Sequence, residues 1–162
     1  MDLLEVKSRI AEALVASIFR RARCQVRPFR SEHPPLRFGR EDFSPDFCVA
    51  PMPDGSAGEE FLVEVKYRPS IDQFISVENQ RGERSVFLLA RRHWPALYFV
   101  LVTDRPEPGR SCFQAIVFAG LRPGQPFRTV DLAEVRELKL FRRNIEDHEE
   151  LVHRIFGLLT GA

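Results

Sequence analysis

Asp46, Glu64 and Lys66 are spaced so that one hairpin would bring two carboxylates and an ammonium group together. Asp46 opens one run of strand-forming residues, and Glu64 and Lys66 lie two residues apart in the next run, Phe61 to Arg68. Because alternate side chains of a strand share a face, Glu64 and Lys66 point one way and their apolar neighbours the other. Asp46, on the neighbouring strand, reaches the same spot. Two converging carboxylates repel each other unless a cation lies between them, and hard divalent cations prefer oxygen ligands.

This spacing predicts a Mg²⁺ site, with Mn²⁺ as a substitute. The expected ligands are Asp46, Glu64 and the backbone carbonyl of Val65, and Glu12 from the first helix completes the shell directly or through a water. Open positions on such a metal accept a phosphate oxygen and a water whose pKa the metal lowers. Lys66 beside that water would orient it or stabilise its deprotonated form. The expected chemistry is metal-assisted hydrolysis of a phosphodiester, with DNA as the partner.

The segment that carries Glu12 is predicted to form a helix over residues 2–23. Asp2 and Glu5 are spaced as a capping box, and apolar residues recur at helical intervals. Glu12 lies at the edge of the resulting apolar face. Lys7 falls inside that face and is expected to extend its ammonium group outward to water.

Five segments are predicted as strands: residues 25–30, 46–52, 61–68, 96–103 and 113–118. The second and third form a hairpin, and the uniformly apolar fourth is typical of a strand buried on both faces in a parallel pair. Further helices are predicted over residues 69–94, interrupted near Gly82, and over residues 144–159, capped by Asn144. The order α-β-β-β-α-β-β-α predicts an α/β (α+β) fold with a central mixed sheet flanked by helices.

The candidate site residues resemble the motif of the PD-(D/E)xK nuclease superfamily, which has the restriction-endonuclease-like fold. The matching residues are Glu12 in the first helix, Pro45-Asp46 and Glu64-Val65-Lys66. The resemblance spans residues 8 to about 103, and small members such as Holliday-junction resolvases and transposon-encoded endonuclease subunits are the most similar in appearance. It implies that Asp46 and Glu64 are metal ligands, that Glu12 is an auxiliary ligand and that Lys66 is catalytic.

The composition predicts one folded domain over residues 1–162. The chain has 44% hydrophobic residues and a formal net charge of +1, which excludes disorder as the main state. The motif core lies within residues 8–120, and residues 130–162 form a helical extension whose apolar face packs on the same core or forms a homodimer seam. No apolar run is long enough to cross a membrane. Three widely spaced cysteines favour a reducing compartment, so a cytoplasmic location is expected.

Arginines near the motif are the expected contacts to the phosphate backbone, because a guanidinium fork suits phosphate. The candidates are Arg68, Arg81 and Arg84. The alternative is that the helical arginines lie on an ordinary solvated face.

Three alternatives to an active nuclease stay open. In the first, Glu64 and Lys66 form an ordinary surface ion pair on an edge strand, and Asp46 is a turn residue after proline. In the second, the chain has the nuclease fold but no catalytic activity, and it acts as a nucleic-acid-binding or assembly subunit. In the third, the chain is a structural domain that neither cleaves nor binds nucleic acid. Other kinds of site have less support, since the sequence has no His-Glu-x-x-His array, no cysteine pairs at zinc spacing and no glycine-rich phosphate loop.

Overall fold

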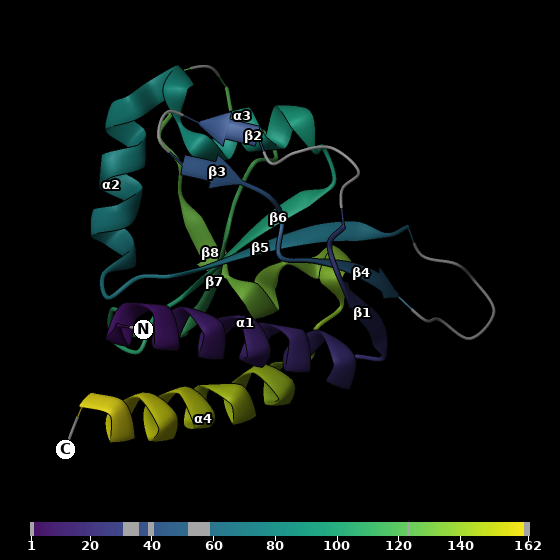
Figure 1. Ribbon diagram of the computed structural model, residues 1–162, viewed down its shortest axis with the longest axis vertical. Coiled ribbons are helices and arrows are strands. Elements are labelled where there is room, and N and C mark those ends of the chain that lie inside the picture. The colour runs from purple at the N-terminus through teal and green to yellow at the C-terminus, as the bar shows by residue number, and fades with distance from the viewer. Residues whose placement is uncertain (1, 31–35, 39–40, 52–58, 123, 161–162) are drawn as a thin grey trace.

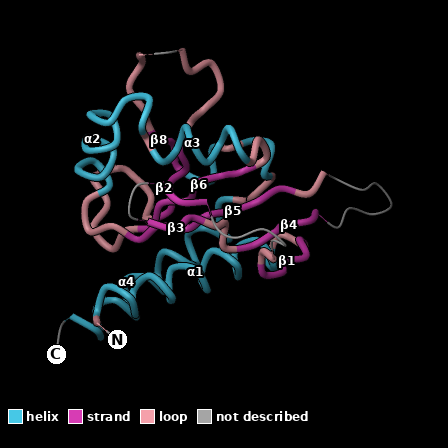
Figure 2. The backbone as a smooth tube through the Cα atoms, turned by 45° about the horizontal axis from the view of Figure 1, so that its top comes forward, coloured by secondary structure: helices cyan, strands magenta, loops and turns pink. Residues whose placement is uncertain are grey.

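A six-stranded mixed sheet is flanked by helices in the computed structural model, which gives the chain a mixed α/β architecture (Figure 1 and Figure 2). The structure describes residues 2–30, 36–38, 41–51, 59–122 and 124–160. Its helices and strands are α1 (Leu3–Arg21), β1 (Cys24–Pro28), β2 (Leu36–Phe38), β3 (Glu41–Phe43), β4 (Phe47–Pro51), β5 (Phe61–Tyr67), α2 (Ile71–Arg81), α3 (Val86–His93), β6 (Leu97–Val102), β7 (Phe113–Ile116), β8 (Thr129–Asp131) and α4 (Arg142–Thr160). Within these ranges, no helix has the length and apolarity needed to cross a membrane.

The strands of the large sheet follow the order β1-β4-β5-β6-β7-β8, so β5 lies in its interior. β4 and β5 pair antiparallel, with Phe47 opposite Val63, which confirms the predicted hairpin. β5 and β6 pair parallel, which confirms the predicted crossover. The chain between them contains α2 and α3, and a parallel pair needs a connection of this length.

Each face of the sheet has its own hydrophobic core, and β6 contributes to both. Val100 and Val102 belong to the core that α1 and α4 cover, whereas Phe99 and Leu101 belong to the core that α2 and α3 cover. Figure 2 shows the strands between these two groups of helices. The uniformly apolar sequence of β6 correctly predicts burial on both faces.

Helix α1 begins as predicted but differs from the prediction at Lys7. The Glu5 amide donates to Asp2 Oδ1 at 2.8 Å, and the Asp2 amide donates to Glu5 Oε2 at 3.3 Å. Lys7 does not reach water; it is buried, and its Nζ donates to the Tyr67 hydroxyl at 3.3 Å and lies 3.6 Å from Asp104 Oδ2. The expectation was wrong because a buried cation is tolerated where an opposite charge is supplied, and Asp104 supplies it from a distant part of the chain.

The predicted element order lacks three short strands and misplaces one helix cap. β2 and β3 form a separate two-stranded sheet, and β8 extends the large sheet at its edge. α4 begins at Arg142, so Asn144 lies inside the helix and is not its cap. The Asn144 side-chain amide instead donates to the Ile18 carbonyl at 2.9 Å, which joins α4 to α1.

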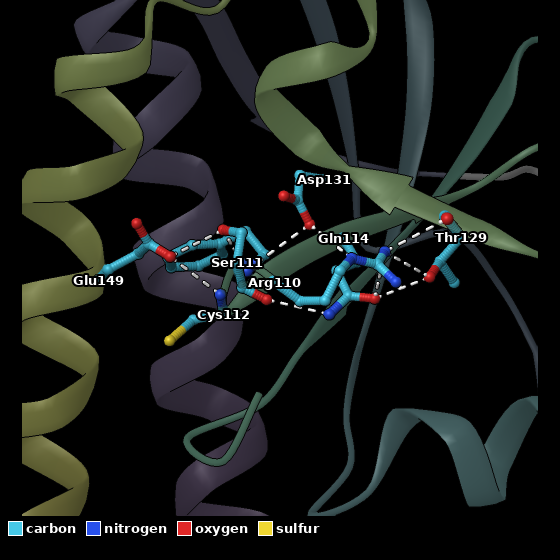
Figure 3. Close-up of polar contacts among 8 residues, drawn as sticks. Arg110, Ser111, Cys112, Gln114, Thr129, Asp131 and Glu149 are labelled. Atoms are coloured by element: carbon cyan, nitrogen blue, oxygen red, sulfur yellow. Dashed lines mark hydrogen bonds and ion pairs between the residues drawn. The ribbon is translucent and has the colours of Figure 1, made fainter. Parts of the chain in front are cut away.

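A polar network joins α4 and β8 to the segment before β7 (Figure 3). The Arg110 guanidinium donates to the Thr129 hydroxyl at 2.9 Å and pairs with Asp131 at 3.1 Å. On α4, Glu149 Oε2 accepts from the Ser111 hydroxyl at 2.9 Å. These contacts hold the C-terminal residues, which the sequence motif does not cover, on the same sheet.

Candidate active site

The candidate site lies where β4 separates from β5. The pairing of the two strands covers Phe61 to Val63 of β5, and the Asp46 amide, just before β4, donates to the Val63 carbonyl at 2.9 Å. Two residues further along β5, the Val65 amide donates to Asp46 Oδ2 at 2.7 Å. The Asp46 side chain thus accepts a hydrogen bond that a backbone carbonyl accepts in a regular strand pair. This bond fixes the Asp46 carboxylate beside the part of β5 that carries Glu64 and Lys66.

Glu64 and Lys66 share one face of β5, as the alternation predicts. The alternating apolar residues of β5, Val63, Val65 and Tyr67, belong to the core under α1 and α4. Glu64 and Lys66 therefore face the side of α2 and α3. Glu64 is only 5% exposed, and its Oε1 lies 3.3 Å from Lys66 Nζ. Lys66 Nζ also lies 5.8 Å from the centroid of the Phe43 ring on β3. The pair therefore joins a buried glutamate to a partly exposed lysine on an internal strand, which differs from the surface pair on an edge strand considered as an alternative.

Three carboxyl groups interact at this point, and their environment raises the pKa of each. Burial is the largest cause for Glu64, whose pKa rises to about 8, and the charge of Asp46 adds to it. The pKa of Glu12, half-buried on α1, rises to about 7 through burial and then through the proximity of Asp46. Burial also raises the pKa of Asp46, against the lowering effect of the Val65 amide and Lys66. Lys66 lowers all three values but does not offset the burial of the acids.

The cluster offers the oxygen donors that a divalent cation prefers. Glu64 Oε2 is buried and, among the described residues, has no hydrogen-bond partner. A water molecule or a cation at this oxygen would satisfy it. Among the described residues, no group of three or more acidic, histidine or cysteine side chains that could hold a metal ion is found, so the site offers oxygen donors but not a complete set of side-chain ligands. The oxygen ligands and their mutual repulsion suit Mg²⁺ or Mn²⁺.

Two of the three arginines expected to contact DNA lie beside the acidic site. Arg68 and Arg81 line a cavity of about 310 Å³ between the end of β5 and α2, and Lys66 forms part of its wall. Arg84 lies in the 3-10 turn Gly82–Arg84 after α2, exposed and outside the lining of this cavity. The structure thus brings Arg68 and Arg81 together with Lys66, and it places Arg84 elsewhere.

A buried network on the opposite face of β5 is absent from the sequence-based expectations. The Tyr67 hydroxyl donates to Asp104 Oδ1 at 2.6 Å and accepts from Lys7 Nζ. Because Tyr67 follows Lys66 directly, the network holds the end of β5 against α1, the helix that carries Glu12. The signal for it was present in the sequence, since a lysine inside an apolar helical face requires a buried partner.

We expect the metal-free protein to lose stability as the pH rises through the range in which Glu64 ionises. The pKa of Glu64 rises from an ordinary value of 4.5 to about 8, so between these values the folded state keeps a proton that the unfolded state releases. The resulting stabilisation is full below about pH 4.5 and is lost as the pH approaches 8, by at most about 1.4 kcal/mol per pH unit.

Urea unfolding in EDTA at several pH values measures this loss. The comparison protein is Glu64→Gln, which has no proton to release at this position and keeps Asp46, Glu12 and Lys66 as neighbours. The stability of Glu64→Gln relative to the unsubstituted protein should rise between about pH 5 and pH 8. Parallel pH profiles for the two proteins would show that Glu64 ionises normally.

Comparison with known proteins adds no relative: no protein-family model, no curated protein and no solved structure matches the chain. Its function must therefore be inferred from the geometry of the site itself.

Proposed function

We propose that the protein is a Mg²⁺-dependent endonuclease that hydrolyses phosphodiester bonds in DNA, with the restriction-endonuclease-like fold and the site of the PD-(D/E)xK nuclease superfamily. The observation that carries the proposal is the convergence of Asp46, Glu64 and Lys66 where β4 leaves β5. Asp46 reaches the Val65 amide at 2.7 Å, and Glu64 reaches Lys66 at 3.3 Å. Two acids and a lysine that meet where β4 leaves β5 supply the groups that metal-assisted phosphodiester hydrolysis requires.

Each residue of the cluster has a distinct role in this proposal. Asp46, Glu64 and the Val65 carbonyl would hold the ion, and Glu12 would support it directly or through a water. When bound, the ion neutralises charge on the phosphate and makes its bound water easier to deprotonate. Lys66 orients the attacking water or stabilises its deprotonated form, and its contact with Glu64 fixes the position of the ammonium group. Burial of Glu64 places its carboxylate where a charge on a bound cation acts strongly.

The surroundings of the cluster support a polyanionic substrate. Arg68 and Arg81 lie on the same side of the sheet as Lys66 and line one cavity with it. Guanidinium groups near a hydrolytic site hold phosphates of the backbone on either side of the reacting one. The net charge of +1 is too small to coat the whole surface with nucleic acid, so binding is confined to this local basic region.

Nicking of a supercoiled plasmid tests the proposed activity. The unsubstituted protein should convert the plasmid to nicked or linear forms in Mg²⁺ or Mn²⁺, and EDTA should stop the reaction. A nuclease fold without turnover would instead bind the plasmid in EDTA and leave it intact in Mg²⁺. A structural domain would show neither binding nor a metal-dependent shift in melting temperature.

A further inference from the structure

A cavity with both apolar and charged residues in its lining lies beside Lys66. Its volume of about 310 Å³ lies at the lower end of the roughly 300–1,000 Å³ typical of small-molecule sites. It opens between the end of β5 and α2, and Figure 1 shows β5 leading directly into α2 at this side of the molecule. Because Lys66 lies in its wall, a group that enters the cavity is adjacent to the cluster of Asp46, Glu64 and Lys66.

One wall of the cavity is aromatic and aliphatic. Phe74 lines it and stacks in parallel on the buried ring of Phe87, with centroids 5.5 Å apart and planes at 9°. Val77, also in the lining, is 45% exposed although it is apolar. A phosphate gains nothing from such a surface, whereas the flat face of a nucleobase gains from packing on apolar side chains and on an arginine that lies over an aromatic ring.

Two guanidinium groups lie on and beside this apolar wall. Arg68 lies 4.4 Å from the centroid of the Phe74 ring and donates to the Tyr67 carbonyl at 2.7 Å. Arg81 pairs at 3.5 Å with Glu78, whose side chain is only 5% exposed. Both arginines line the cavity together with its apolar residues. A nucleotide whose base enters the cavity therefore has cations nearby that can pair with its phosphates.

We propose that this cavity receives one unpaired nucleobase of the substrate, next to the phosphodiester at the acidic cluster. A base stacked inside a duplex cannot enter it, so the preferred substrate class is nucleic acid with an unpaired nucleotide: a single strand, a bulge or a base rotated out of the helix. The proposal deepens the nuclease function and rests on it for the position of the reacting bond.

A binding experiment in EDTA tests the proposal without cleavage. Two fluorescein-labelled DNA duplexes are compared by anisotropy: one has a single bulged 2-aminopurine, and the other has an abasic spacer at the same position. The base-containing bulge should bind about 5- to 50-fold more tightly, and the 2-aminopurine emission should fall on binding as the base stacks. Equal affinities with unchanged emission would overturn the proposal.

Substitution of the aromatic wall provides the matched comparison. Phe74→Leu keeps an apolar side chain on Phe87 but removes the ring over which the Arg68 guanidinium lies, so it should abolish most of the preference for the base over the abasic spacer. Phe141→Leu is the control, because Phe141 is 48% exposed and lies at the start of α4, outside the lining of the cavity. Retention of the preference in Phe74→Leu would contradict the assignment of this wall.

This result is separable from the nuclease activity. If the base preference appears in EDTA but the plasmid is never cut in Mg²⁺, the nucleobase site stands and the nuclease proposal fails. If cleavage occurs but the two duplexes bind equally, the nuclease proposal stands and the cavity has no base-binding role.

Discussion

Glu64→Gln is expected to stop Mg²⁺-dependent DNA cleavage without destabilising the metal-free protein. Glu64 is a proposed ligand, and loss of its negative charge should lower the cleavage rate on the order of a thousandfold, which corresponds to several kcal/mol of transition-state stabilisation. The same change removes a carboxyl group whose ionisation is disfavoured by burial and by Asp46. Glutamine fills the same volume and keeps an oxygen that accepts from Lys66, so packing is preserved.

The opposite directions of these two effects make the substitution diagnostic. Most inactivating changes of a buried residue also lower stability, whereas this one should leave the urea midpoint in EDTA at pH 8 unchanged or higher. Glu59→Gln is the matched control, because Glu59 is exposed just before β5 and should retain both activity and stability. Cleavage by Glu64→Gln at the unsubstituted rate would remove Glu64 from the site.

Lys66→Met is expected to lower the cleavage rate about 100- to 10,000-fold, the range for loss of a group that assists proton transfer. Methionine has a similar length but no charge, so it can neither orient the attacking water nor stabilise its deprotonated form. Binding of Mn²⁺ should persist, because Lys66 is not a ligand. Single-turnover cleavage of plasmid at saturating protein measures the rate, and Mn²⁺ titration followed by calorimetry measures the metal affinity.

Lys139→Met provides the corresponding control. Lys139 is exposed at the end of the turn before α4, and the same substitution there should leave the cleavage rate unchanged. If Lys66→Met lost Mn²⁺ binding together with activity, the role of Lys66 would be to hold the site together. If it retained full activity, Lys66 would have no part in the reaction.

The local order around the site is predictable from the sequence because it depends on short-range rules. Alternation along residues 61–67 sets the face of Glu64 and Lys66, and β5 shows it, because Val63 and Val65 belong to one core whereas Leu62 packs against the other. The unbroken apolar run of β6 predicts an interior strand with a parallel neighbour, and the intervening helices supply the crossover. The capping box of Asp2 and Glu5 fixes the start of α1 in the same local way.

The features that could not be predicted depend on partners far along the chain. Lys7 is buried because Asp104 meets it, and no local pattern connects the two residues. Asn144 resembles a cap by type and position, yet the carbonyl of Ile18 on α1 recruits its side chain into the α1–α4 contact. β8 has three residues, too few to show a period, and pairs only because β7 presents an edge to it.

The candidate site likewise has features that the sequence predicts and features that depend on tertiary contacts. The sequence indicates that Asp46 and Glu64 converge, but it does not reveal that the Val65 amide holds the Asp46 carboxylate. It also marks Arg81 and Arg84 equally, although the turn after α2 carries Arg84 away from the cavity that Arg81 lines. Such distinctions depend on tertiary geometry rather than on residue type.

A crystal structure of the protein soaked in Mn²⁺, with the anomalous signal of the metal recorded, tests the central claim most directly. We predict one strong peak next to the carboxylates of Asp46 and Glu64, at metal–oxygen distances of roughly 2.0–2.4 Å. A peak at another position, or carboxylates that remain bonded to Lys66 and the Val65 amide with no metal between them, would contradict it.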